Sequence, residues 1–279
     1  MNKTFDTTAF TVPARHNPRL QLLVDRLGAD AELRQLWGCA NVNAVERLEM
    51  SDHGEVHLRI VANAALRLLR LLREAGHPAS LVTHYRFAPE EAEVVVVLAA
   101  ALHDLGISIH YDNHADYSLL LARLKAKEVL ADLYPVREQT ILISEILHAI
   151  AAHHGQLRCL TLEAGILKLA DALDMTAGRA RPLGALNGKA TLVGGLALKA
   201  RHADARGREH ALGDFGVDQV LIKRGDSKPV RLEVHLNRAT GLQRIEDMLY
   251  QKLQHSPLFG LVEVIARTEW EALPLREMA

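Results

Sequence analysis

Histidines and carboxylates stand at the ends of apolar segments in the middle of this chain. The clearest case is the pair His103-Asp104, which directly follows the apolar residues 94–102. A charged group inside a core must be paired, hydrogen-bonded or bound to a metal, because an unpaired buried charge costs several kcal/mol. Adjacent residues of a helix point about 100° apart, so both side chains reach one ion only near their shared edge. Alone, such a pair is more typical of a polar helix end than of a metal site.

Further candidate ligands lie before and after this pair. His57 follows a turn-forming segment, and Asp171 and Asp174 lie in a segment rich in alanine and leucine. If these side chains lie on three or more helices, they can converge in the middle of a bundle, which is how bundle metal sites are built. The donors are nitrogen and oxygen without thiolate, a set that suits Mn²⁺, Fe²⁺, Co²⁺, Ni²⁺ or Zn²⁺ as a catalytic ion.

Apolar residues recur at helical spacing through most of the first 175 residues. The helices expected from this spacing cover residues 19–47 with a break near Gly28, 55–75, 90–102, 116–133, 138–153 and 162–175. Ser51 or Asp52 is the expected N-cap of the helix that begins near residue 55. Four consecutive valines at 94–97 would normally indicate a strand. The proline and acids just before them and the long apolar continuation favour a helix instead.

The pattern of apolar residues changes after Pro182 from helical spacing to the alternation typical of strands. Strands are expected over residues 190–203, 219–223 and 230–237, and a last one over 261–266, with a hairpin turn at Gly225 and a helix over 241–254. We therefore predict a mainly α protein, in which a helical bundle is followed by a small α+β domain. The expected divisions are an N-terminal arm and helices (1–50), a metal-binding helical domain (51–185) and the α+β domain (186–279).

The composition limits the cellular compartment and the kinds of partner that we expect for this protein. Lys and Arg number 33 against 34 Asp and Glu, so the net charge of −1 indicates no attraction to nucleic acid or membranes. Cys39 and Cys159 form no disulfide framework, which suits a reducing compartment. The first 18 residues lack the apolar stretch of a signal peptide, and the longest apolar run is too short to span a bilayer. A cytoplasmic location is expected.

The segment from Ser51 to Arg181 resembles the HD-domain superfamily of metal-dependent phosphohydrolases. The resemblance rests on His57, on the stretch Leu-His-Asp-Leu-Gly that ends at Gly106, and on Asp171, in the order His…His-Asp…Asp. It implies an HD-type helical bundle with a metal held by His57, His103, Asp104 and Asp171. The whole chain is similar to a group of uncharacterised prokaryotic HD proteins with a small C-terminal α+β domain.

The resemblance also implies further roles around this metal. Some superfamily members hold two ions, and the candidates here for second-metal or phosphate ligands are His53, His110, His148, His153 and His154. His114 is a weaker candidate. Asp104, His110 and His148 are the expected catalytic groups, with either histidine donating a hydrogen bond or a proton. Arg59, Lys168, Arg179 and Arg181 are candidates for holding phosphate.

The function implied is hydrolysis of a nucleotide or another phosphate ester by a water that a divalent ion activates, with one or two ions of Mn, Fe, Co, Ni, Zn or Mg. A catalytically silent metal- or nucleotide-binding regulatory module and a di-iron oxygenase are the alternatives. Residues 105–110 lack the acidic pair of the ppGpp hydrolases, and no Gly-Tyr-Pro signature of the cyclic-di-GMP branch follows His154. The C-terminal part carries no recognisable motif; we hypothesise that it mediates interaction, including assembly into a homo-oligomer.

Overall fold

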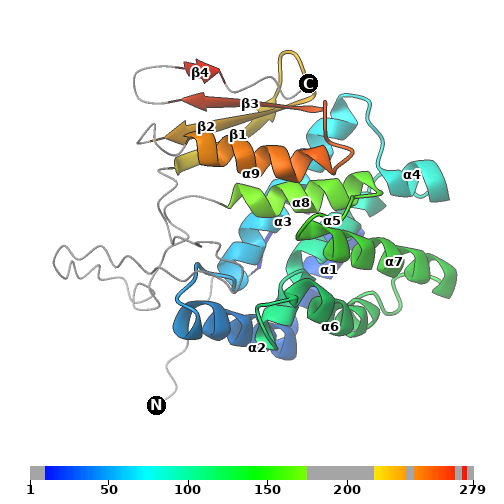
Figure 1. Ribbon diagram of the computed structural model, residues 1–279. Helices are drawn as coiled ribbons and strands as arrows, with labels where there is room; N and C mark the ends of the chain where they lie inside the picture. The colour runs from blue at the N-terminus through cyan, green and yellow to red at the C-terminus, as the bar shows by residue number, and fades with distance from the viewer. Residues whose placement is uncertain (1–9, 175–216, 237–241, 268–271, 275–279) are drawn as a thin grey trace.

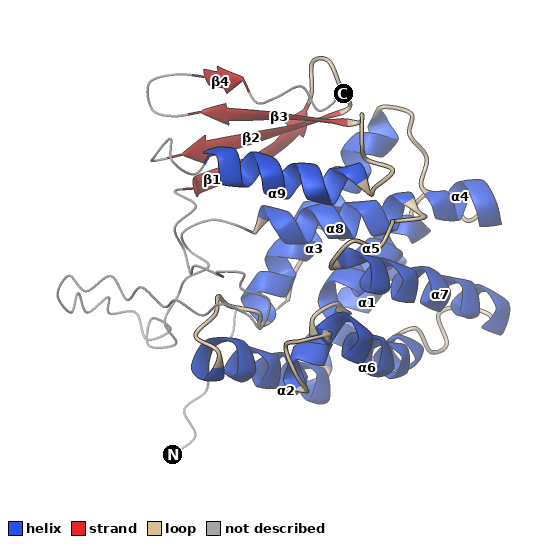
Figure 2. Cartoon of the chain, in the orientation of Figure 1, coloured by secondary structure: helices blue, strands red, loops and turns tan. Residues whose placement is uncertain are grey.

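Among the described residues, the regular elements as far as Leu173 are all helices, and the first strand begins at Val217 (Figure 2). The structure is a computed structural model that describes residues 10–174, 217–236, 242–267 and 272–274. The helices are α1 (Pro18–Ala29), α2 (Ala31–Asn41), the π-helical η1 (Val42–Arg47), α3 (Glu55–Glu74), α4 (Ser80–Tyr85), α5 (Glu91–Leu102), the 3₁₀-helical η2 (Leu105–Ser108), α6 (His114–Val129), α7 (Val136–His153), α8 (Leu162–Leu173) and α9 (Leu242–Gln254). The strands are β1 (Val217–Arg224), β2 (Val230–Leu236), β3 (Val262–Arg267) and β4 (Ala272–Pro274).

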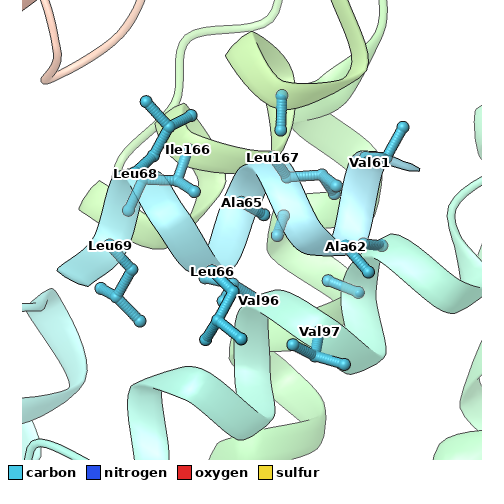
Figure 3. Packing of buried hydrophobic residues seen from close by; sticks show 14 of the residues in the cluster. Val61, Ala62, Ala65, Leu66, Leu68, Leu69, Val96, Val97, Ile166 and Leu167 are labelled. Carbon is cyan, nitrogen blue, oxygen red and sulfur yellow. The ribbon is translucent and has the colours of Figure 1, made fainter. Parts of the chain in front are cut away.

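Helix α5 is the centre of the bundle, and all its residues are buried. It contacts α1, α3, α7 and α8. Figure 3 shows Val96 and Val97 packed against the buried face of α3, with Ile166 and Leu167 of α8 close by. A helix that is apolar all round is stable only when it is enclosed on every side, which is the case here. The helix predicted for the valine run is confirmed.

Most helix boundaries agree with the sequence pattern, and the differences have local causes. The break expected near Gly28 falls at Asp30, whose carboxylate caps α2 by accepting a hydrogen bond from Leu33 N at 2.8 Å. The capping role predicted for Ser51 or Asp52 is wrong, because α3 begins after Gly54 without a side-chain cap. Asp52 instead accepts a hydrogen bond from Gly54 N at 3.1 Å within the turn.

Other predictions need correction in the later elements. The helix expected over 116–133 runs from His114 to Val129, and the short α4 was not expected. The strand β3 is not the last one, because β4 follows it. The strand expected over 190–203 lies outside the described residues, as does the boundary between residues 185 and 186. The division of the chain into three parts therefore stays a prediction.

The C-terminal strands form one sheet in the order β1-β2-β3-β4. β1 and β2 are antiparallel around the turn at Gly225, which confirms the predicted hairpin. β2 and β3 are parallel, and α9 lies in the crossover that parallel neighbours require. Helix α9 packs along α8, between α8 and the sheet in the view of Figure 1. This contact brings the C-terminal part close to the helix that carries Asp171.

Buried apolar residues of the bundle, the sheet and α9 belong to one hydrophobic cluster. Among the described residues, no helix combines the length and the apolar character needed to cross a membrane.

Candidate metal centre

The ends of three buried helices bring the four predicted metal ligands together. His57 lies in the first turn of α3, His103 and Asp104 directly follow α5, and Asp171 lies in the last turn of α8. The Nε2 atom of His57 is 3.4 Å from Asp104 Oδ2 and 3.5 Å from Asp171 Oδ1. The Nε2 atom of His103 is 3.3 Å from the same oxygen of Asp104 and 3.7 Å from the same oxygen of Asp171. We call these four residues the first group.

The second oxygen of Asp104 faces two further histidines. Asp104 Oδ1 is 3.5 Å from His114 Nε2 and 3.8 Å from His153 Nε2. These two ring nitrogens are 3.3 Å apart, and both side chains are buried. Asp104, His114 and His153 form what we call the second group. The carboxylate of Asp104 therefore lies between the two groups and presents one oxygen to each.

Backbone and carboxylate acceptors fix how the rings of these histidines are protonated. Nδ1 of His57 bonds to Asp174 Oδ2 at 2.7 Å, and Nδ1 of His103 bonds to Ala100 O at 2.9 Å. Nδ1 of His114 bonds to Tyr111 O at 2.9 Å, and Nδ1 of His153 bonds to Ile150 O at 2.6 Å. Because a carbonyl or carboxylate oxygen only accepts, each Nδ1 must carry the hydrogen. In the neutral ring, Nε2 then presents its lone pair to Asp104, which is the arrangement that a metal-ligating histidine needs.

These residues fit a divalent cation. His103 Nε2 is buried and has no hydrogen-bond partner among the described residues. The facing Nε2 atoms of His114 and His153 would repel each other as two lone pairs. The carboxylates of Asp104 and Asp171 add negative charge in a largely buried place. A cation coordinated by these nitrogen and oxygen atoms would give the unpaired nitrogen a partner, separate the two lone pairs and balance the negative charge. The donor set suits Mn²⁺, Fe²⁺, Co²⁺, Ni²⁺ or Zn²⁺.

The electrostatics of the two groups keep Asp104 ionised and His153 neutral, which are the forms that bind metals, but favour a proton on His103. Burial opposes ionisation of Asp104, but His103 and His57 outweigh it and hold the pKa of this carboxyl well below its usual range. Burial and the neighbouring His103 hold the pKa of His153 well below its usual value, so this ring is neutral. Burial would lower the pKa of His103, but Asp104 and Asp171 outweigh it and raise that pKa to about 10. A divalent ion would therefore displace a proton at His103.

Two more predicted histidines lie at the edge of the cluster. His53 is buried, and its ring centroid is 5.4 Å from that of His57. Its Nδ1 bonds to Ser51 O at 2.7 Å. His154 is exposed, with its ring centroid 4.8 Å from that of His114. His53 therefore borders the first group, and His154 borders the second group.

The structure does not bring the two predicted proton donors to this cluster. His110 is exposed, and its Nδ1 accepts a hydrogen bond from Asp112 N at 3.0 Å. His148 Nε2 accepts one from Leu160 N at 3.0 Å, which ties α7 to the segment before α8. The imidazoles that lie against Asp104 are those of His57, His103, His114 and His153, and neither His110 nor His148 is among them.

The predicted phosphate-binding cations have different surroundings. Lys168 is fully buried, and its Nζ donates to the carbonyls of Gly155 at 3.0 Å and Leu157 at 2.8 Å. Its ammonium group therefore stabilises the segment before α8 by donating to these two carbonyls. Arg59 is partly buried on α3, with its charge near Glu55 one turn earlier. Arg179 and Arg181 lie outside the described residues, so their role stays a prediction.

Three residues take part that sequence reasoning underweighted or missed. His114 is the ligand candidate that His110 was expected to be, because the start of α6 turns its ring inward. Asp174 orients His57. Lys252 of α9 places Nζ 3.3 Å from Asp171 Oδ2 and 3.2 Å from His153 O. The sequence gave a signal for Asp174, through its spacing from Asp171, and for His114, as a candidate ligand. It gave none for Lys252, whose contacts with Asp171 and His153 are tertiary.

Comparison with known proteins agrees with this site. Residues 55–176 match the family described as the HD domain. The chain is also 32% identical over 251 residues to "Uncharacterized protein MJ1020" of Methanocaldococcus jannaschii, an alignment that covers 90% of each chain. No solved structure matches the chain. The fold and the site define a helical bundle with buried His and Asp groups of the kind that can hold a metal ion. The chain belongs to the HD-domain superfamily of metal-dependent phosphohydrolases.

Proposed function

We propose that this chain is a metal-dependent phosphohydrolase that acts on a nucleotide or another phosphate ester. The observation that supports the proposal is the position of Asp104, with one oxygen toward each of two groups of inward-facing imidazoles. A divalent ion held there supplies a Lewis acid for a phosphoryl oxygen and lowers the pKa of a coordinated water toward neutrality. One or two ions fit this donor set.

The chain's own residues bind the metal ions, and one of them contacts the phosphate group. His57, His103, Asp104 and Asp171 hold the first ion, and His114 and His153 with Asp104 offer a second place. The exposed ring of His154 lies at the edge of the second group, where its N–H can donate a hydrogen bond to a phosphate oxygen. We assign to His154 the donor role that the sequence suggested for His110 or His148.

Metal content and phosphate release test this proposal together. We expect one or two divalent ions per chain in protein purified without a histidine tag, and phosphate release from nucleotides or phosphate esters that depends on added Mn²⁺. Asp104→Asn removes the carboxylate shared by both groups and should reduce turnover by at least about 100-fold. The matched control is Asp116→Asn, an exposed position in the first turn of α6 that should keep full turnover.

The other outcomes separate the alternatives. Bound metal without turnover of any phosphate ester would indicate a regulatory or binding module. An iron chromophore with oxygen consumption would indicate a di-iron oxygenase. Absence of metal after reconstitution would contradict the assignment of the site.

A further inference from the structure

Lys252 is a cation from the C-terminal part that reaches the metal centre. It lies on α9, more than 80 residues after Asp171 in the sequence, and its Nζ is 3.3 Å from Asp171 Oδ2. The same Nζ donates to His153 O at 3.2 Å. One ammonium group therefore contacts both the first group and the end of α7, the helix that carries His153 of the second group.

The packing of α9 explains how Lys252 gets there. Leu249 and Leu253 are buried, and Gln251 and Gln254 are exposed, so Lys252 lies at the border of the buried face. Its side chain keeps 20% exposure. A lysine in such a position covers apolar surface with its stem and extends its charged end to a polar partner. Here that end meets the last turn of α8.

The contact divides the two oxygens of Asp171. Oδ1 faces the Nε2 atoms of His57 and His103, whereas Oδ2 faces Lys252. Burial opposes ionisation of Asp171, and Lys252 is the largest opposing influence that keeps its pKa well below the usual range. A charge-assisted hydrogen bond on Oδ2 fixes the carboxylate rotation, and with it the direction of Oδ1. Residues that orient a ligand in this way affect metal affinity without touching the metal.

We propose that Lys252 is a positioning residue of the metal centre, supplied by the C-terminal part of the chain. It holds Asp171 with Oδ1 toward His57 and His103, so that docking of α9 and binding of the metal support each other. By linkage, a metal that binds the docked form better must also stabilise the docking of α9 by the same factor. The proposal rests on the metal binding inferred under the proposed function.

Variants of the full chain distinguish this role from a merely structural link between α8 and α9. Lys252→Met keeps the stem and removes the charge, and Lys252→Arg keeps a donor for the carboxylate. Gln251→Met is the matched control on the exposed side of the same helix. Mn²⁺ affinity is measured by competition with a chromophoric chelator. Hydrogen exchange of residues 242–254 is measured with and without Mn²⁺.

We expect Lys252→Met to weaken Mn²⁺ binding by about 10- to 100-fold. Lys252→Arg should stay within about threefold of the wild type, and Gln251→Met should equal it. Mn²⁺ should slow exchange in α9 of the wild type and of Gln251→Met, but not of Lys252→Met. A structural link alone would lower the stability of the metal-free protein without changing either metal-dependent readout.

Unchanged Mn²⁺ affinity in Lys252→Met, or equal protection of α9 by Mn²⁺ in that variant, would overturn the positioning role while leaving the metal centre intact. Failure of the wild type itself to bind Mn²⁺ would overturn the proposed function and this inference together. The wild-type measurement thus tells the two failures apart.

Discussion

At the scale of single residues, the site is defined by the hydrogen bond that the Nδ1 atom of each imidazole donates. Four histidines donate from Nδ1 to an oxygen and keep Nε2 for the centre. In three of them the acceptor is the carbonyl three residues earlier, which depends on the local backbone: helical before His103 and His153, and a turn before His114. His57 differs, because its acceptor is the carboxylate of Asp174 at 2.7 Å. That carboxylate orients the ring and raises its basicity as a ligand.

Asp174→Asn should therefore weaken divalent-metal binding by about tenfold. The amide retains the size of the side chain but removes the charge that steadies the Nδ1–H of His57. Isothermal titration with Mn²⁺ gives the affinity directly. Asp116→Asn serves again as the control. Equal affinity in Asp174→Asn and the wild type would show that His57 needs no carboxylate partner.

At the scale of elements, the close approach of η2 to α6 sets the second group. Gly106 lies against the backbone at the start of α6, where an added Cβ would come well within 3.0 Å of His114 O and Ser118 N. Gly106 N also donates to Ser118 Oγ at 2.8 Å. A residue without a side chain is thus required at this position, and it holds the end of α6 from which His114 faces Asp104.

Gly106→Ala should destabilise the protein by about 3 kcal/mol, because the backbone must move to admit the methyl group. It should also reduce the stoichiometry or affinity of a second metal ion, since His114 moves with α6. Urea unfolding and metal titration measure the two effects. Gly28→Ala is the matched control, because nothing lies within 4 Å of its added Cβ and α1 is helical there. That substitution should be neutral or stabilising by about 0.5 kcal/mol.

At the scale of the whole molecule, Glu93 connects the N-terminal segment to the bundle. It is fully buried on α5 and accepts hydrogen bonds from Arg70 Nε at 2.9 Å and Asn17 Nδ2 at 3.2 Å. His16 Nε2 lies 3.2 Å from the same carboxylate. Burial would raise the pKa of Glu93, but these partners outweigh it and lower the pKa below the ordinary 4.5. One charge thus joins the start of α1 to α3 and α5, two of the helices that position the metal-ligand candidates.

Glu93→Gln should cost about 3 kcal/mol of unfolding free energy at pH 7, because Arg70 loses its buried partner. The native pKa is lower than that of the unfolded chain. The carboxylate's contribution is therefore full above about pH 4.5 and is lost as the pH falls through the lowered native value. Urea unfolding of both proteins at pH 7 and at pH 3 should show the gap shrinking in acid.

Glu90→Gln provides the comparison for that measurement, because this half-exposed acid directly precedes the same helix. Its cost should stay below about 0.5 kcal/mol at either pH, as for exposed ion pairs. A gap for Glu93→Gln that is independent of pH would contradict the role given to its charge.

The sequence by itself determined the first group and the helices that carry it. His57, the pair His103-Asp104 and Asp171 could be assigned through the resemblance to the HD superfamily, because that resemblance rests on residue type and order, which are properties of the chain alone. The interior helix α5 was predictable for a related reason, since its entry residues and length outweigh the β preference of four valines.

Only the tertiary structure decided which of several equivalent residues face the centre. The inward ring is that of His114 and not His110, because α6 begins at His114 and so sets its direction. The cation that contacts Asp171 is Lys252, whereas Lys168, which is nearer in the sequence, donates to loop carbonyls. Local spacing fixes the face of one helix, but contacts between residues far apart in sequence depend on how separate helices pack, which no local pattern encodes.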